Sequence, residues 1–179
     1  MDTGTATDRE ALRRELSRAL SDPACLAAPG RVTVYADGTL LMSPPPSLAH
    51  DRRARRIAAL MEQLAPHGQA MCPAAVEVFD VVRQMPTAKH ADAAWSPRFD
   101  AMIASGQQAA HPAPEICVEV LSPGNTGREI SDKKTEYFRA GASEVWIVEV
   151  NGKVHFHLGE NGPVVQSSRL IPDFPGCVD

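Results

Sequence analysis

The clearest change in the pattern of apolar and polar positions lies between residues 115 and 150. Residues 115–121 are mostly apolar and β-branched and end at a Ser-Pro-Gly turn, which is typical of a strand. From residue 126 to 140 the apolar spacing becomes helical, and Gly141 is placed to end that helix. Residues 144–150 are apolar again. This strand–helix–strand unit predicts two parallel neighbouring strands with the helix packed on one face of their sheet.

The rest of the chain carries weaker signals of the same kind. Asp37-Gly38 and Asn151-Gly152 are typical hairpin turns between short apolar runs. We interpret residues 98–104 as a strand and residues 83–97 as a loop close to the substrate. The other expected elements are helices over residues 7–20 and 47–64, strands over residues 31–35, 39–43, 69–82 (one bent strand or two), 153–158 and 163–167, and a tail with little structure over residues 173–179.

The composition fits one globular domain with a sizeable core, because 44% of the 179 residues are hydrophobic and 22% are charged. We predict a helical extension over residues 1–24, one α/β (α+β) domain over residues 25–170 and a tail over residues 171–179. No apolar run reaches the length of about 18 residues that a membrane span needs. The acidic, polar N-terminus lacks the apolar core of a signal peptide, so a cytoplasmic protein is expected.

Charge and cysteine content narrow the choice of partners. The net charge is −4, so no global positive field attracts nucleic acid, although a local basic patch can still form. The densest basic cluster, which includes Arg52, Arg55 and Arg56, is either a solvated helix face or a set of phosphate contacts. The cysteines have no zinc-site spacing and are expected to be free thiols, at Cys25, Cys72, Cys117 and Cys177.

Glu119 lies inside the first apolar strand of the unit, where a carboxylate is costly unless it is paired or binds a cation. Lys133 and Lys134 occupy the first half of the following helix, and a lysine stem can reach from a helix to a carboxylate on the strand below. Helical spacing alone does not choose between the two lysines. A structural ion pair is the simplest alternative to a reactive site.

Several motifs resemble one known family. The segments EVLSP, KKTEY, RAG and EVWIVEV are similar to the signature of the Uma-two family, which belongs to the PD-(D/E)XK nuclease superfamily of bacterial restriction-endonuclease-like proteins. Upstream, ADGTLLMSPPPSLAH resembles the family's hairpin, Ser-Pro turn and histidine, and RFDAMIAS resembles its Pro-Asp strand. The likeness covers roughly residues 30–160. It implies a mixed, bent β-sheet flanked by helices.

The resemblance also implies a metal site and a reaction. Asp100 and Glu119 would hold Mg²⁺ or Mn²⁺ on neighbouring strands, with the backbone carbonyl of Val120 as an extra ligand. The lysine four residues before the family's tyrosine would act on the phosphate, which favours Lys133 over Lys134. His50 occupies the family's histidine position and is a candidate for supporting contacts. The partner would be DNA, with no membrane, and a two-fold homodimer would suit cleavage of both strands.

Three functions follow from these observations. The first is a metal-dependent DNA endonuclease of restriction or DNA-processing type. The second is a catalytically weak or inactive binding module with the nuclease fold, which the acidic net charge suits, and Thr39 stands where the family often has Glu. The third is an interaction protein in which Glu119 and Lys133 form a structural pair. Divalent-metal binding separates the first from the other two.

Overall fold

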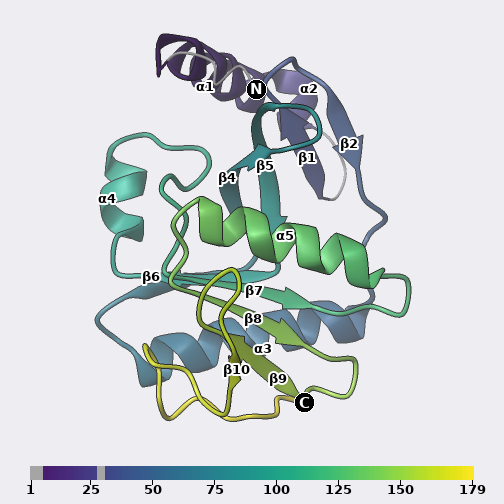
Figure 1. Cartoon of the computed structure of the whole chain (residues 1–179), viewed down its shortest axis with the longest axis vertical. Coiled ribbons are helices and arrows are strands. Elements are labelled where there is room, and N and C mark those ends of the chain that lie inside the picture. Colours follow the sequence, from purple (N-terminus) through teal and green to yellow (C-terminus); the bar gives the residue numbers. More distant parts are fainter. Residues whose placement is uncertain (1–5, 28–30) are drawn as a thin grey trace.

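The protein, described here from a computed structural model over residues 6–27 and 31–179, has two β-sheets and flanking helices (Figure 1). The predicted mixed α/β class is confirmed. The helices are α1 (Ala6–Leu20), α2 (Pro23–Leu26), α3 (Leu48–Leu64), α4 (Phe99–Ala104) and α5 (Gly127–Arg139). The first sheet has the order β2-β1-β5-β4, formed by Leu40–Met42, Val32–Tyr35, Met85–Ala91 and Ala74–Asp80. The second has the order β10-β9-β8-β7-β6-β3, formed by Val164–Val165, Val154–His157, Glu144–Val148, Ile116–Val120, Ala93–Ser96 and Gln69–Met71.

The strand–helix–strand unit is confirmed as β7, α5 and β8. Strands β7 and β8 are parallel, with Glu119 opposite Ile147. Helix α5 begins after Thr126, whose side chain accepts a hydrogen bond from the backbone N–H of Glu129 at 3.2 Å. The chain leaves the helix through Gly141, whose φ of 110° favours glycine. This unit therefore fixes the place of α5 over the strand that carries Glu119.

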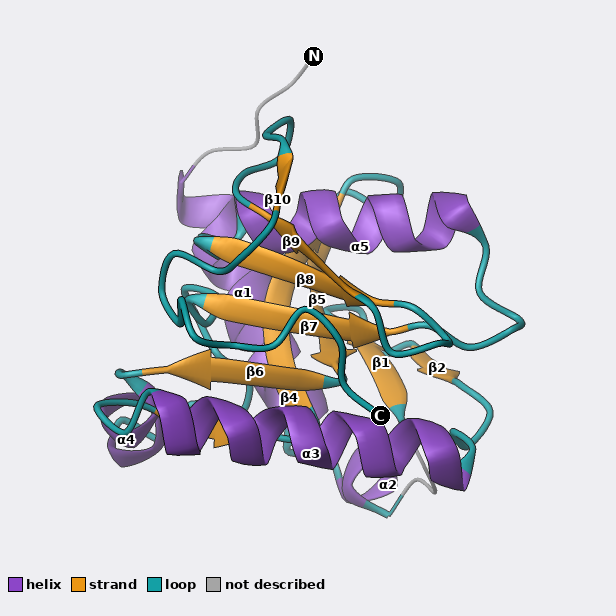
Figure 2. Ribbon diagram, turned by 90° about the horizontal axis from the view of Figure 1, so that it is seen from below, coloured by secondary structure: helices purple, strands orange, loops and turns teal. Residues whose placement is uncertain are grey.

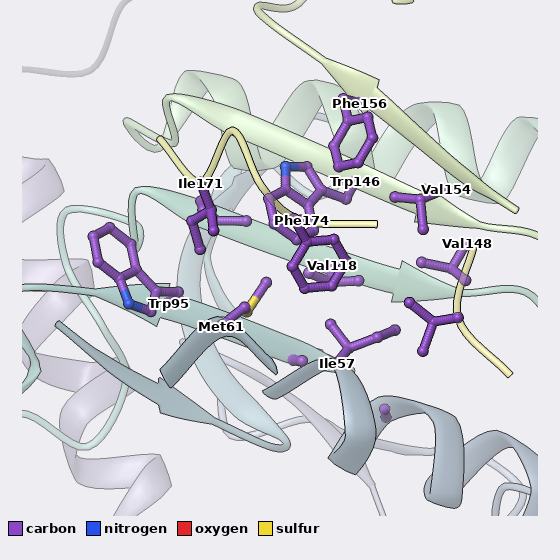
Figure 3. Packing of buried hydrophobic residues seen from close by; sticks show 14 of the residues in the cluster. Ile57, Met61, Trp95, Val118, Trp146, Val148, Val154, Phe156, Ile171 and Phe174 are labelled. Atoms are coloured by element: carbon purple, nitrogen blue, oxygen red, sulfur yellow. The ribbon is translucent and has the colours of Figure 1, made fainter. Parts of the chain in front are cut away.

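Helices α3 and α5 lie on opposite sides of strands β6 to β8 (Figure 2). Ile57 and Met61 of α3 pack against Val118 and Trp146, together with residues from the C-terminal segment (Figure 3). On the other side, buried Tyr137 of α5 lies between the second sheet and β4 of the first sheet. Helix α5 thus connects the two sheets, and the polar residues described below gather beside it.

The expected strand over residues 98–104 is wrong, because this segment forms helix α4. Phe99 and Met102 lie three residues apart and are both buried, which is the spacing of one helix face. The expected loop over residues 83–97 is also wrong, because it contains β5 and β6. β5 lies between β1 and β4 and pairs with both, so tertiary pairing determines a strand where the local composition favours none.

The C-terminal segment is likewise more ordered than expected. Ile171, Phe174 and Val178 are buried in the core beneath the second sheet, although the prolines around them are typical of a loop. The carboxylate of buried Glu144 accepts the backbone N–H groups of Arg169 at 2.7 Å and Leu170 at 3.0 Å. The segment therefore completes the core. No helix in the described part of the chain is long and apolar enough to cross a membrane.

Candidate active site

Glu119 lies near the C-terminal end of β7, and its side chain is only 4% exposed. It points toward α5, where the ammonium group of Lys133 donates to Oε2 at 2.8 Å and the hydroxyl of Tyr137 donates to Oε1 at 2.7 Å. Lys133 and Tyr137 are one helical turn apart, so both reach the same carboxylate. The predicted contact of Lys133 with Glu119 is confirmed. Lys134 is directed elsewhere, where its charge acts on His157 of β9.

The hydroxyl of Tyr137 is a permanent donor at this position. Burial raises the pKa of Tyr137 well above its ordinary value, and the negative charge of Glu119 raises it further. A phenol that stays protonated holds one oxygen of Glu119 while Lys133 holds the other. The carboxylate is therefore fixed in orientation, and its charge is balanced by the ammonium group of Lys133.

Asp92 lies beside Val120, directly before the neighbouring strand β6. It occupies the single position between β5 and β6 and is 2% exposed. Its backbone N–H donates to the carbonyl of Val118 at 2.9 Å, and its Oδ2 accepts the N–H of Val120 at 2.6 Å. Its Oδ1 accepts from the guanidinium group of Arg31. Asp92 is thus attached to β7 one residue beyond Glu119.

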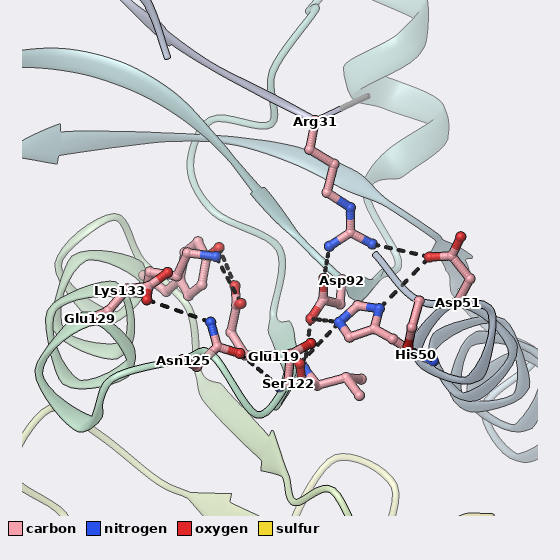
Figure 4. Close-up of polar contacts among 12 residues, drawn as sticks. Arg31, His50, Asp51, Asp92, Glu119, Ser122, Asn125, Glu129 and Lys133 are labelled. Atoms are coloured by element: carbon pink, nitrogen blue, oxygen red, sulfur yellow. Dashed lines mark hydrogen bonds and ion pairs between the residues drawn. The ribbon is translucent and has the colours of Figure 1, made fainter. Parts of the chain in front are cut away.

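His50, in the first turn of α3, closes this side of the site (Figure 4). Its Nε2 lies 3.1 Å from Oδ2 of Asp92 and 3.0 Å from the carbonyl oxygen of Val120. Its Nδ1 lies 3.7 Å from Oδ1 of Asp51. Burial lowers the pKa of His50, and the charge of Arg31 lowers it further, which favours the neutral imidazole. The local reason for this placement is Ser47, which caps α3 by accepting the N–H of His50 at 3.2 Å.

The expected placement of Asp100 on a strand beside Glu119 is wrong. Asp100 lies in the first turn of α4, is exposed, and its Oδ1 accepts a hydrogen bond from the side chain of Gln69 at 2.9 Å. Strand β7 lies between β8 and β6 in the sheet, and β6 begins directly after Asp92. The sequence-based interpretation missed Asp92 and Arg31. An acid followed at once by the apolar run Ala-Ala-Trp was the one local signal that could have indicated Asp92.

The basic cluster of α3 divides into two kinds of residue. Arg53 donates to the carbonyl oxygens of Val178 at 3.0 Å and Val150 at 2.9 Å, so it holds the C-terminus in place. Arg52, Arg55 and Arg56 are exposed on the same helix, which begins at the site through His50. Their guanidinium groups are accessible to a ligand in solution.

The residues of the site suit a hard cation. Asp92, directly before β6, and Glu119, on the adjacent strand β7, are buried carboxylates, and Val120 follows Glu119 in the chain. Their carboxylate oxygens and the carbonyl oxygen of Val120 are ligands of the kind that Mg²⁺ and Mn²⁺ prefer. Within residues 6–27 and 31–179, no three His, Cys, Asp or Glu side chains converge on one point. Both carboxylate oxygens of Glu119 accept hydrogen bonds from α5, from Lys133 and Tyr137. Buried Nδ1 of His50, on the side of the ring that faces Asp51, has no hydrogen-bond partner among the described residues.

Comparisons with known proteins identify the fold and the family of the chain. A crystal structure from Anabaena variabilis, described as "a putative nuclease belonging to DUF820", superposes with a TM-score of 0.60. It covers 83% of this chain and 89% of the other, and at 13% identity it shows a shared fold. No curated protein matches the chain. The family model described as "Uma2: Putative restriction endonuclease" matches residues 22–170. The chain therefore belongs to the Uma2 family of restriction-endonuclease-like proteins.

Proposed function

We propose that this protein is a divalent-metal-dependent endonuclease that hydrolyses phosphodiester bonds of DNA. One observation carries the proposal: buried Asp92, directly before β6, and buried Glu119, on the adjacent strand β7, lie beside Val120, and a lysine lies 2.8 Å from Glu119. Two acids and a lysine also occur in sites with other functions, and membership of the Uma2 family supports nuclease activity among them.

Asp92, Glu119 and the carbonyl of Val120 would hold Mg²⁺ or Mn²⁺. When bound, such an ion supplies a water of lowered pKa as nucleophile and neutralises charge on the phosphate. Asp100, at a different place in the fold, has no part in this proposal.

The chain's own residues have separate tasks. Tyr137 holds one oxygen of Glu119 in place, and Arg31 does the same for Asp92. Lys133 presents an ammonium group next to the carboxylates, where it would donate to a phosphate oxygen with a charge-assisted hydrogen bond. Lys133 would be available for the phosphate when a bound cation neutralises Glu119.

The exposed arginines of α3 would contact the DNA backbone. Arg52, Arg55 and Arg56 supply a local basic surface on a protein whose net charge is −4. Phosphate contacts of this kind give affinity that falls with salt and carries no sequence information. A two-fold dimer would present two such sites to the two strands of a duplex.

Plasmid cleavage in Mg²⁺ or Mn²⁺ tests the proposal with two matched pairs of variants. Asp92→Asn should abolish cleavage, whereas Asp100→Asn should leave it unchanged. Lys133→Ala should lower the rate by about 100-fold or more, the scale of losing one transition-state donor, with metal affinity nearly intact because lysine is not a ligand. Lys134→Ala should behave like wild type.

Melting curves in EDTA and in millimolar Mn²⁺ give a second reading. A ligand that binds only the folded state raises its stability, by about 2.7 kcal/mol at one hundred times Kd, so the melting temperature should rise for wild type and not for Asp92→Asn. If wild type shows no cleavage and no metal-dependent rise in melting temperature, the proposal is overturned in favour of a binding module with the nuclease fold.

A further inference from the structure

The outer edges of the two sheets differ in how their backbone groups are used. The first sheet ends at β2 and β4, and the second ends at β10 and β3. On β4, the N–H of Glu77 donates to the carbonyl of Ala110 at 3.1 Å, and the N–H of Ala110 donates back to Ala75 at 2.8 Å. On β3, the N–H of Ala70 donates to the carboxylate of Glu62 at 3.2 Å. Strand β10 has only two residues, so these three edges are covered, capped or short.

Strand β2 is the edge that has none of these devices (Figure 1). The carbonyl of Thr39 and the N–H of Ser43 bond to backbone groups at the two ends of β1, at 3.0 Å and 2.9 Å, and Leu41 lies between them in the paired register. Because backbone groups alternate along a strand, the N–H and C=O groups of Leu40 and Met42 point away from β1. In the described part of the chain, β2 pairs with β1 alone and no other group bonds to these outward N–H and C=O groups.

The side chains of β2 give the edge no protection either. Leu40, Leu41 and Met42 are 36%, 54% and 54% exposed, and all three are apolar. The segment 38–44 contains no charged residue, and its proline follows the strand at position 44. Edge strands of soluble proteins usually carry a lysine, a proline or a bulge that prevents pairing with another chain. An exposed apolar edge without them indicates that another strand covers it.

We infer that β2 pairs antiparallel with β2 of a second copy of this chain, around a two-fold axis at Leu41. In this alignment Leu40 lies opposite Met42 of the second copy, and their outward N–H and C=O groups bond to each other. Leu41 lies opposite Leu41 of the second copy, at a position without hydrogen bonds, where opposing side chains are closest. Apolar residues then meet on both faces, no like charges are opposed, and the two four-stranded sheets become one.

The area of this edge determines how strong the dimer should be. A stable interface buries about 800 Å² of each partner, and three partly exposed side chains supply only part of that area. The pairing should therefore be reversible, with a Kd of about 10 μM. Arg31, which contacts Asp92, directly precedes β1, so the interface lies one strand away from each candidate site. The proposed function includes a dimer without naming its surface, and this inference does not depend on nuclease activity.

Sedimentation velocity of the full chain, at concentrations below and above the expected Kd, tests the inference. Wild type should change from monomer to dimer as the concentration rises. Leu41→Lys and Leu41→Glu each place two like charges at the axis, so each should raise Kd by about tenfold or more. An equimolar mixture of the two variants should recover the dimer, because only the mixed pair places opposite charges across the axis. Circular dichroism checks that each variant is folded, as expected for a half-exposed position.

Val164→Lys is the matched control. Val164 is also apolar and 52% exposed, but it lies on β10, an edge of the other sheet, so the variant should dimerise like wild type. A wild type that is monomeric at every concentration would overturn the inference and mean that a different partner covers β2. A dimer that survives both Leu41 variants, a mixture that stays monomeric, or a loss of the dimer in Val164→Lys would overturn it as well. Plasmid cleavage tests the proposed function separately, and its absence would leave this inference standing.

Discussion

Glu119 shows how a carboxylate is tolerated inside an apolar strand. Its two oxygens are taken by different donors from one helix, the ammonium of Lys133 and the hydroxyl of Tyr137. An unpaired carboxylate at this depth would cost several kcal/mol, about as much as a small domain has in total stability. Each of the two buried carboxylates therefore has a cationic partner: Lys133 pairs with Glu119, and Arg31 pairs with Asp92.

Replacing Tyr137 with Phe removes one donor to this buried charge and keeps the ring. The free energy of unfolding should fall by about 1.5–3 kcal/mol, the range for a hydrogen bond to a charged group. Chemical denaturation in EDTA measures it. The double variant with Lys133→Ala should lose a different amount from the sum of the single losses, because both act on one carboxylate. Strict additivity would mean that the two donors act independently.

The two halves of the site differ in how far the sequence could predict them. Lys133 and Glu119 are 14 residues apart inside one strand–helix–strand unit, so the geometry of the unit brings them together. Arg31 and Asp92 are 61 residues apart; Arg31 directly precedes β1, and Asp92 lies between β5 and β6. Their contact depends on long-range strand pairing, which local patterns do not encode. The motif RFDAMIAS gave an acid that lies in helix α4 and not in the expected strand.

At the scale of elements, short-range signals were sufficient where each strand or helix has its own cap, turn or β-branched run. The β1–β2 hairpin, α3, α5 and the β8–β9 hairpin were predicted from such signals and are confirmed. Strand β5 has few β-branched residues and is a strand because β1 and β4 pair with it on both sides. The loop predicted over residues 83–97 was wrong because pairing with neighbouring strands had more influence than the low strand propensity of these residues.

Strand β5 also carries a buried ion pair that attaches it to α5. The ammonium group of Lys89 lies 2.7 Å from both carboxylate oxygens of Glu136 and 3.7 Å from Asp80. Burial raises the pKa of Glu136, and Lys89 opposes that rise. Asp80 has other donors, the backbone N–H groups of Val82 and Arg83 at 2.9 Å. Glu136 is therefore the group that depends on Lys89.

Lys89→Met should destabilise the protein by about 3–5 kcal/mol, because it leaves Glu136 buried without a partner. Adding Glu136→Leu should recover most of that loss, since replacing both members of a buried pair with apolar residues is often nearly neutral. Denaturant titrations of the two variants decide this. A double variant as unstable as Lys89→Met alone would mean that the ion pair itself, rather than the unpaired carboxylate, determines the stability.

At the scale of the whole molecule, the last residues of the chain complete the core. Phe174 is 4% exposed and packs against Trp146, with ring centroids 4.5 Å apart. Phe174→Ala should cost about 3–5 kcal/mol of the free energy of unfolding, as removal of a buried aromatic side chain does. Val164→Ala on β10, at a position 52% exposed, should stay within about 0.5 kcal/mol of wild type. A similar loss in both would contradict a core role for the C-terminal segment.

Stability should also depend on pH through the histidines of the whole molecule. Burial is the main cause that lowers the pKa of four of them, His50, His90, His111 and His157. In the unfolded chain these groups titrate near about pH 6.5, so below that pH the unfolded state binds protons that the folded state resists. The stabilisation is complete above the unfolded value and is lost as the pH falls through the lowered folded-state values.

Urea titrations at several pH values should therefore give a free energy of unfolding that is nearly constant above about pH 7 and falls between about pH 6.5 and 5. His157→Gln, on β9, should make this fall shallower, because one of the four groups is removed. Glu136 acts in the opposite direction: its raised pKa favours the folded state as the pH falls toward the unfolded value of a glutamate, about 4.3. If the free energy of unfolding instead rises between about pH 6.5 and 5, carboxyl groups with a raised pKa, such as Glu136, have a larger effect than the four buried imidazoles.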